Sequence, residues 1–489
     1  MPVHFTLRVT AKALRLTKRV LLCLLVLLVM FLLVRIYETE RGPALHPWHK
    51  WVPEEMSEKE IDRASFREYQ TAEENLFHEM KSEVTEKLSA DEKTPLNRYY
   101  EGSLVYPEKF TRDWNRSYIL MPEGTPRGAV VLLHGLTDTP YSLRHVAESY
   151  RQRGFVAVAP RLPGHGTVPA ALTRVDWEDW MAATRLGVRE ATRLAGPSVP
   201  LHIVGFSNGG ALAMKYALDA LDNKSLRRPQ RIVLLSPMIG VTSFARFAGL
   251  AGMPAIFPAF AKAAWLNIVP EFNPFKYNSF PVNAARQSYL LTQALQQQIL
   301  KYAKEKNGSR LPPVLTFQSV MDSTVSTRAV VNSLYNYLGN NGSELVVFDL
   351  NQAVSFRPLF RHSSWTAIGN LLPHAPRQYT TTLLTNASQS SLNMVARTTL
   401  AGQDHESVQP LTLQYPPDIY SLSHVAVPFP VTDALYGSQP ENNAYGVNFG
   451  TIRMRGETAV LVVGLESLMR VTSNPFFPWM MERIERDIP

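Results

Sequence analysis

Short apolar runs alternate with amphipathic stretches from about residue 103 onward. The apolar runs lie at residues 129–134, 155–160, 201–206, 231–236, 314–320 and 344–350. Segments with helical spacing lie between the first four runs, near residues 141–153, 177–195 and 208–220. Strands that are apolar on both faces and separated by helices are typical of a mostly parallel sheet. The pattern therefore predicts an α/β architecture.

Two stretches interrupt the alternation and are interpreted as insertions. Residues 241–313 are rich in Phe, Trp, Pro and Met and end in a helix around 284–305, which favours a helical lid. The apolar side chains of this segment either pack only on the sheet or also line a substrate pocket, and its position favours the pocket. Residues 351–417 are rich in Thr, Ser, Asn and Pro, with candidate strands at 379–385 and 411–415.

The region from residue 38 to residue 100 is predicted to be a linker followed by an amphipathic helix. Ser57 to Glu60 match the capping-box pattern that opens a helix. Apolar residues then recur at steps of three or four from Tyr69 to Leu88, which predicts one continuous helix. The spacing leaves open whether this stripe packs on the main domain or on a second copy of the chain.

An uninterrupted apolar run at residues 20–34 follows a basic flank. Such a run suits a signal-peptide core or a short membrane anchor. No small-x-small cleavage site follows it, so the sequence favours an uncleaved transmembrane anchor over residues 20–37, with a cleaved signal peptide as the alternative. The positive-inside rule then makes residues 1–19 a basic cytoplasmic segment.

Charge and cysteine usage narrow the function classes. The net charge is +8, but six basic residues and no acid fall within the first 35 positions, which leaves +2 for the other 454. No basic stripe remains to suggest a nucleic-acid partner. Cys23 is the only cysteine, so an intramolecular disulfide is excluded. We expect no metal and no organic cofactor, because no HExxH, paired CxxC or phosphate-loop motif occurs.

A candidate nucleophile lies where the run 201–206 meets the next helix. Gly205-Phe206-Ser207-Asn208-Gly209 satisfies GxSxG directly after a strand and before a helix, which is the context that this motif requires. Ser207 is then expected in a strained turn, with its hydroxyl at the helix N-terminus. A glycine-rich packing turn without catalysis is the alternative.

A serine nucleophile needs a base and an acid that orients the base, in the chain order Ser, Asp or Glu, His. Asp322 follows the run 314–320 and is the candidate acid, although it could instead cap the next helix. Four histidines lie beyond it, and chain order alone does not choose among them: His362, His374, His405 and His424. The apolar and proline-rich setting of His424 favours it, with the more hydrophilic His405 as the alternative.

The tetrahedral intermediate of acyl transfer also needs fixed hydrogen-bond donors. One expected donor is the backbone N–H of Asn208, and the other is that of Leu136, after the strand that ends in His134-Gly135. We expect His134 itself to hold this loop rather than to carry a proton.

The motifs HGLTDTP, RLPGHG, GFSNGG, MDSTV and SLSHVAVPF resemble those of the α/β-hydrolase superfamily, particularly its carboxylesterase, monoacylglycerol lipase and serine aminopeptidase-like (S33-type) branch. The resemblance covers about residues 100–489. It implies an α/β-hydrolase domain at 101–489 with the lid insertion at about 241–313 and a second insertion at about 351–417. The residues that it implies for the reaction are a triad of Ser207, Asp322 and His424, with Leu136 and Asn208 forming the oxyanion hole. It also implies a structural role for His165.

These features predict a membrane-anchored serine hydrolase that cleaves acyl esters, from a small ester or a lipid, through an acyl-enzyme. A serine aminopeptidase or amidase is an alternative, but amine recognition needs an acidic subsite, and residues 241–283 offer only Glu271. A non-catalytic binding scaffold on the same fold is a second alternative. We expect the anchor in a bacterial inner membrane and the folded domain in the periplasm.

Overall fold

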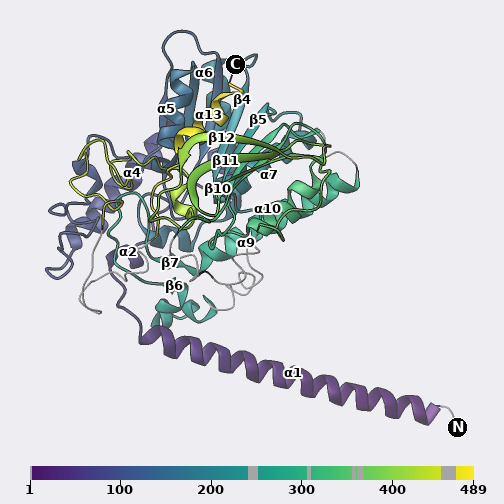
Figure 1. Cartoon of the computed structure of the whole chain (residues 1–489). Coiled ribbons are helices and arrows are strands. Elements are labelled where there is room, and N and C mark those ends of the chain that lie inside the picture. Colours follow the sequence, from purple (N-terminus) through teal and green to yellow (C-terminus); the bar gives the residue numbers. More distant parts are fainter. Residues whose placement is uncertain are drawn as a thin grey trace.

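The computed structural model describes residues 3–240, 252–305, 310–354, 360, 368–452 and 470–488. Within these ranges a 10-stranded sheet runs in the order β1-β3-β2-β4-β5-β8-β9-β10-β11-β12 (Figure 1). Its strands are β1 (Tyr118–Leu120), β2 (Gly128–Leu133), β3 (Phe155–Ala159), β4 (Leu201–Phe206), β5 (Arg231–Leu235), β8 (Val314–Ser319), β9 (Glu344–Phe348), β10 (Thr380–Ser388), β11 (Ser391–Thr399) and β12 (Ser407–Gln414). The strands from β3 to β10 in this order pair in parallel, whereas β1, β11 and β12 pair antiparallel. The predicted α/β architecture with a mostly parallel sheet is confirmed.

Helices cover both faces of the sheet, which explains why its central strands are apolar throughout. In β2, Ala129, Val131 and Leu133 belong to one core with residues of α6 (Trp177–Ala195), α7 (Asn208–Asp222) and α9 (Val282–Lys304). Val130 and Leu132 belong to a second core with α5 (Arg144–Gln152) and α13 (Phe477–Glu485). Because alternate side chains enter opposite cores, neither face of the strand can be polar.

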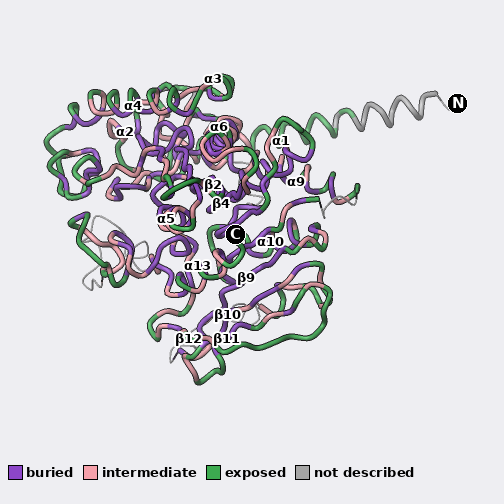
Figure 2. The backbone as a smooth tube through the Cα atoms, turned by 90° about the horizontal axis from the view of Figure 1, so that it is seen from above, coloured by how far each residue is buried: buried purple, intermediate pink, exposed green. Residues whose placement is uncertain are grey.

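The segment interpreted as a second insertion continues the sheet. β10 pairs in parallel with β9, and β10, β11 and β12 form an antiparallel meander at the end of the sheet. Figure 2 shows these three strands at the opposite side of the molecule from α3 and α4. The two candidate strands overlap β10 and β12, but β11 was not predicted. Its exposed and buried residues mix along its length, so it carries no apolar run.

The expectation of one continuous helix after Ser57 is wrong. The chain forms α3 (Glu58–Arg63) and α4 (Phe66–Glu83), with extended backbone at Ala64 and Ser65 between them. Ser65 caps α4, because its side chain accepts a hydrogen bond from the Glu68 N–H while Glu68 reaches back to the Ser65 N–H. Tyr69 of α4 belongs to the main core, so the apolar stripe packs on the same chain.

A buried ion-pair network fastens the residues before β1 to the sheet. The Arg161 guanidinium, 1% exposed, binds both carboxylate oxygens of Glu55 at 2.7 and 2.8 Å. It also lies 3.4 Å from the carboxylate of Glu73, which accepts hydrogen bonds from the N–H and hydroxyl of Ser117. A second contact joins Glu55 to the Gly164 N–H at 2.8 Å. The N-terminal region is thus an integral part of the fold.

We expect Glu55→Gln to lower the free energy of unfolding by about 3 kcal/mol, because removing one partner leaves a buried charge poorly compensated. Urea unfolding in detergent, followed by circular dichroism, measures the change. Glu54→Gln is the matched control, since Glu54 is exposed. Equal unfolding midpoints for the two variants would show that the pair adds nothing to stability.

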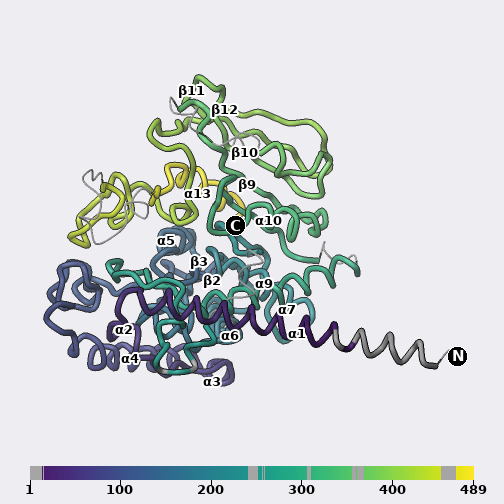
Figure 3. Tube along the Cα trace, turned by 90° about the horizontal axis from the view of Figure 1, so that it is seen from below, coloured from purple at the N-terminus to yellow at the C-terminus, as the bar shows by residue number. Residues whose placement is uncertain are grey.

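The N-terminal helix α1 (Val3–Glu40) extends away from the body of the protein (Figures 1 and 3). Its part Leu16–Glu40, which contains an 18-residue window with a mean hydropathy of 3.0, is long and apolar enough to cross a membrane, a test that a signal sequence also passes. Near its end, the Arg35 guanidinium donates a hydrogen bond to the Trp265 carbonyl. The Lys262 ammonium donates to the carbonyls of Glu40 and Gly42, each at 3.1 Å.

Trp265 and Lys262 belong to the first insertion, between β5 and β8. Its described part contains the 3-10 turns η6 (Met253–Ile256) and η7 (Pro258–Ala264), the two-stranded hairpin of β6 (Trp265–Asn267) and β7 (Phe280–Pro281), and α9. The segment is therefore less helical than expected before α9. Residues 241–251 and 306–309 of the predicted lid lie outside the described residues.

Candidate active site

Ser207 occupies a sharp turn between β4 and α7. Its backbone has φ 52° and ψ −114°, a left-handed conformation that is strained for any residue except glycine. The neighbouring glycines are required by space: a Cβ on Gly205 would lie 2.3 Å from the Gly209 carbonyl oxygen, and a Cβ on Gly209 would lie 1.9 Å from that of Leu133. The bend therefore depends on the spacing of Gly, Ser and Gly in the sequence.

Asp322 and His424 meet at the neighbouring strand ends. Asp322 follows β8, and His424 begins the short turn η11 (His424–Ala426). The His424 Nδ1 lies 2.8 Å from Asp322 Oδ2, and His424 is 4% exposed. The other carboxylate oxygen accepts from the N–H groups of Thr324 and Val325 at 2.8 and 3.0 Å. Asp322 is not the cap of the next helix, since Ser326 has that place.

The Asp322 carboxylate is stabilised in its charged form. Burial raises its pKa, but the hydrogen bond and charge of His424, together with the two backbone N–H groups, outweigh burial and leave the pKa below its usual value. The acid is thus ionised at neutral pH. The stability that this group contributes is present above its ordinary pKa and is lost as the pH falls through the lowered value.

His424 follows Asp322 by 102 positions, and the chain between them leaves the site and returns to it. Asn351, after β9, binds the carbonyls of Pro416 and Ile419 through its side chain and that of Tyr420 through its N–H. The chain therefore returns to the place where it left, and β10 to β12 lengthen the sheet without moving His424 away from Asp322.

The two other histidines after Asp322 that the structure describes do not contact it. His405 is largely exposed and pairs with Asp404, 3.7 Å away, and His374 is also exposed. His362 lies outside the described residues. The hydroxyl of Ser207 makes no hydrogen bond to a described residue, and the ring of Phe206 lies 5.3 Å from that of His424. Hydrogen bonds between a catalytic nucleophile and its base are commonly long in proteins without bound substrate.

Two backbone N–H groups lie beside Ser207 without acceptors. Those of Leu136 and Asn208 donate to no described residue, and Asn208 is the first residue of α7, where the helix itself supplies no acceptor. A Cβ on Gly135 would lie 3.2 Å from that of Ser207, so the loop that carries Leu136 lies against the turn. Thr137 has φ 61°, and its carbonyl accepts from the Tyr277 N–H at 2.8 Å.

His134 and His165 have structural contacts. His134 accepts a hydrogen bond from the Leu162 N–H at Nε2, at 3.0 Å, and its Nδ1 lies 2.9 Å from the Gly135 carbonyl. Burial holds the pKa of His134 well below its usual value, so the ring is neutral. His165 contacts the carbonyls of Leu162 and Pro163 through Nδ1. As expected, His134 holds the loop that carries Leu136. The Leu162 N–H that binds His134 belongs to the loop whose Gly164 is bound by Glu55.

A cavity of about 210 Å³ adjoins the candidate site. Its wall includes Phe206 and Val425, the residues next to Ser207 and His424. Aromatic side chains of the first insertion and of the C-terminal part complete the apolar side, among them Phe272 and Phe429. The first insertion therefore lines the cavity, as its apolar composition indicated.

The same cavity contains three charged residues that sequence reasoning did not identify: Asp138, Lys276 and Arg470. Burial raises the pKa of Asp138 to about 6, against the opposing effect of Lys276. Burial lowers the pKa of Lys276, and Asp138 opposes this change. Asp138 was visible within HGLTDTP, but no local pattern joined it to Lys276 or Arg470. Glu271, the acid considered for amine recognition, is buried and binds the N–H groups of Asn278 and Ser279.

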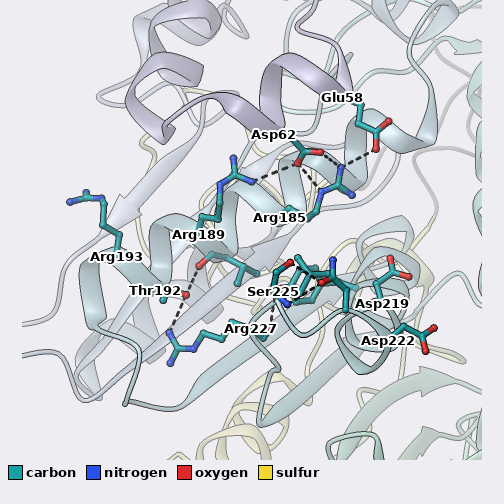
Figure 4. A pocket seen from close by; sticks show the side chains of 14 residues that line it. Glu58, Asp62, Arg185, Arg189, Thr192, Arg193, Asp219, Asp222, Ser225 and Arg227 are labelled. Atoms are coloured by element: carbon teal, nitrogen blue, oxygen red, sulfur yellow. Dashed lines mark hydrogen bonds and ion pairs between the residues drawn. The ribbon is translucent and has the colours of Figure 1, made fainter.

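A larger hollow of about 890 Å³ lies between α3, α6 and α7 and contains none of the predicted site residues (Figure 4). Its charged side chains largely pair with one another, as Arg185 does with Asp62 and Glu58 at 2.7 and 3.0 Å. In the part of the chain that the structure describes, no group of three or more His, Cys, Asp and Glu residues could hold a metal ion.

Known proteins match the centre of this chain. Residues 124–334 match the family described as serine aminopeptidase, S33. A thermostable monoacylglycerol lipase of Bacillus sp. (strain H-257) is 37% identical over 95 residues, 19% of this chain and 36% of the relative. A carboxylesterase of Bacillus subtilis (strain 168) is 30% identical over 121 residues, 24% of this chain and 48% of the relative. The chain thus spans less than half the length of either relative.

Among solved structures, a soluble variant of monoglyceride lipase from Saccharomyces cerevisiae, in complex with a substrate analog, is 15% identical to this chain. The match has a TM-score of 0.36 and covers 47% of this chain and 81% of that one. The parallel sheet and the turn at Ser207 give the chain an α/β-hydrolase fold, and its central part, residues 124–334, is similar to the carboxylesterase, monoacylglycerol lipase and S33-like branch of that superfamily.

Proposed function

We propose that the protein is a membrane-anchored serine hydrolase that cleaves acyl esters. The observation that carries this proposal is the strained Ser207 at the end of β4, on the sheet edge where His424 and Asp322 are hydrogen-bonded at 2.8 Å. Backbone strain at a polar residue beside a cavity is typical of functional sites. Ser207 is the nucleophile, His424 the general base and Asp322 the acid that orients the base.

In the proposed reaction, the Ser207 oxygen attacks the acyl carbon while His424 Nε2 takes the hydroxyl proton. The N–H groups of Leu136 and Asn208 bind the oxygen that becomes negative. His424 then gives its proton to the leaving alcohol, and the acyl group stays on Ser207. Water next attacks this ester, again losing a proton to His424, and the carboxylic acid leaves as Ser207 regains its proton. Asp322 stabilises the charged imidazole in both halves.

An ester substrate is better supported than an amine-bearing peptide. The curated relatives are named a monoacylglycerol lipase and a carboxylesterase, which supports an acyl ester or lipid substrate. The carboxylate of Glu271 already binds two backbone N–H groups, so it is not free to recognise an amine. The first insertion, whose residues line the cavity, is proposed as a lid over the acyl group.

The test is a comparison of chromogenic acyl esters, from short to long chain, with aminoacyl anilides. We expect hydrolysis of esters, and covalent labelling of the protein by a fluorophosphonate. Hydrolysis of the anilides but not of the esters would contradict the proposed esterase activity and indicate an aminopeptidase. A folded protein that hydrolyses neither and resists the label would be a binding scaffold.

We also propose that α1 anchors the domain, with residues 1–19 in the cytoplasm and the domain in the periplasm of a bacterium. Contacts of Arg35 and Lys262 place the end of α1 against the first insertion, where the exposed side chains of Met253, Phe257 and Leu266 would meet the lipid surface. The lid would then lie where a lipid substrate is found.

We expect the protein to stay in the membrane pellet after carbonate extraction, with an N-terminal epitope tag still attached. Leu24→Arg with Leu27→Arg should weaken insertion, because each arginine at the centre of a span costs about 2.5–3.5 kcal/mol. The exposed pair Leu96→Arg and Leu104→Arg is the control. Loss of the tag from the mature protein would instead indicate a cleaved signal peptide.

A further inference from the structure

The cavity beside Ser207 combines an apolar wall with an unpartnered cation. Lys276 lines this cavity and is half-buried. No described residue forms a hydrogen bond or an ion pair with its ammonium group. An ammonium group removed from much of its water without a partner is unfavourable, so such groups in proteins are normally paired. The arrangement indicates that the partner of Lys276 is supplied by a ligand.

The polar neighbours of Lys276 in the cavity wall are already engaged. Asn273 accepts from the hydroxyl of Tyr436 at 2.8 Å, and Asn278 donates to the Pro270 carbonyl at 2.8 Å. Thr472 donates to the Tyr436 carbonyl at 2.8 Å. These contacts hold the cavity wall in place, and none of them involves the ammonium group of Lys276.

The charged groups near Lys276 give this end of the cavity an excess of positive charge. Arg470 lines the same cavity and uses one donor on the hydroxyl of Thr324, at 3.3 Å, and its other donors contact no acceptor among the described residues. Asp138 is the opposing charge, from the loop that carries Leu136, and its Oδ2 is buried without a hydrogen-bond partner. Asp138 and Lys276 act on each other electrostatically but form no ion pair. Two cations thus face one carboxylate.

We propose that the substrate is an acyl ester that also carries an anionic group, a carboxylate or a phosphate, which Lys276 and Arg470 bind in the cavity beside Ser207. This inference rests on the proposed function. Phe206, Val425 and Phe429 contact the apolar part of the substrate, while the two cations fix the distance between its anion and its ester bond. A charge-assisted hydrogen bond to an oxyanion is among the stronger contacts that a protein makes.

Two matched substrate pairs test the proposal and separate the sources of the anion. The first pair compares the p-nitrophenyl monoester of glutaric acid with p-nitrophenyl pentanoate, so that the anion is on the acyl chain. The second compares a monoacylglycerol phosphate with the corresponding monoacylglycerol, so that the anion is on the leaving group. We expect kcat/KM of the wild-type protein to be about 10- to 100-fold higher for the anionic member of one pair.

Lys276→Met should abolish that preference by lowering kcat/KM for the anionic ester far more than for the neutral ester, whereas Lys276→Arg should retain it. Lys301→Met is the matched control, because Lys301 is exposed on α9 and pairs with Asp222. Equal use of neutral and anionic esters by the wild-type protein, or an equal loss for both in Lys276→Met, would overturn the inference while leaving the hydrolase in place.

Calorimetric titration of the full-length protein in detergent with glutarate, and with glutaramide as the uncharged comparison of the same length, gives a readout that does not need turnover. We expect glutarate to bind at least about 10-fold more tightly, and Lys276→Met to lose this difference. A protein that hydrolyses no ester and resists fluorophosphonate but keeps the glutarate preference would refute the proposed function and retain the anion site. Equal weak binding of glutarate and glutaramide would refute the site.

Discussion

Ser207→Ala is expected to abolish covalent labelling by a fluorophosphonate and to lower kcat for ester hydrolysis by about 10⁶-fold. Among the described residues, only Ser207 combines a hydroxyl with the strained turn and the adjacent N–H groups of Leu136 and Asn208, which donate to no described residue. Alanine retains the turn, because the Cβ is already accommodated, and removes only the attacking oxygen. Labelling followed by gel fluorescence, and p-nitrophenyl ester hydrolysis, measure the two effects.

Ser236→Ala is the matched control. Ser236 follows β5, next to β4, and like Ser207 it is a buried serine with a positive φ, of 44°. Its hydroxyl has no hydrogen-bond partner among the described residues, so its removal should leave labelling and hydrolysis within about twofold. Labelling that persists in Ser207→Ala, or disappears in both variants, would contradict the assignment of the nucleophile.

The central strands of the sheet were predictable because a strand buried on both faces appears in the sequence as a short run of apolar residues. Each central strand has to supply apolar side chains to two cores, so β2, β4 and β8 stand out as short apolar runs. β11 lies near the end of the sheet, where only part of the strand is buried, and such a strand lacks this apolar run. Burial on both faces therefore explains why the central strands were predictable, but it does not explain why a strand was also predicted at β12, on the edge of the sheet.

The helix break was missed despite a local signal. Ser65 to Glu68 repeat the capping-box pattern of Ser57 to Glu60, and each pattern starts a helix. The periodic apolar residues begin only at Tyr69, after the break, so they gave no sign of it. A second polar start signal should therefore be interpreted as the start of a new helix.

The candidate site was partly predictable from local motifs. The turn at Ser207 is marked by a local motif: Gly205 is required by the nearby Gly209 carbonyl, and only the requirement for Gly209 comes from a distant residue, Leu133. His424 was harder to predict, because its approach to Asp322 depends on the return of the chain to Asn351. The charged end of the cavity depends wholly on tertiary structure, since Asp138, Lys276 and Arg470 come from three distant segments. Local chemistry predicts the reaction class, whereas the substrate depends on long-range packing.

Asp322→Asn should lower kcat by about 10⁴-fold while the fold is retained. One oxygen of Asp322 accepts from the N–H groups of Thr324 and Val325, and the other faces His424 and accepts from Gln318 at 3.0 Å. An asparagine oxygen is expected to keep the two backbone contacts, which turns its NH₂ toward His424 Nδ1. That ring nitrogen must then accept, and the proton moves to Nε2.

A histidine protonated at Nε2 cannot take the proton of Ser207, so Asp322→Asn should react slowly with fluorophosphonate as well as with esters. Asp349→Asn is the control, because Asp349 is a buried acid at the end of β9 that accepts from the Thr385 hydroxyl and the Leu350 N–H. The Thr385 hydroxyl, which donates to Asp349, can instead accept a hydrogen bond from the NH₂ group of an asparagine. Activity should therefore stay within a few-fold. Similar losses in the two variants, measured as labelling rate and as kcat, would mean that Asp322 acts on stability rather than through the tautomer of His424.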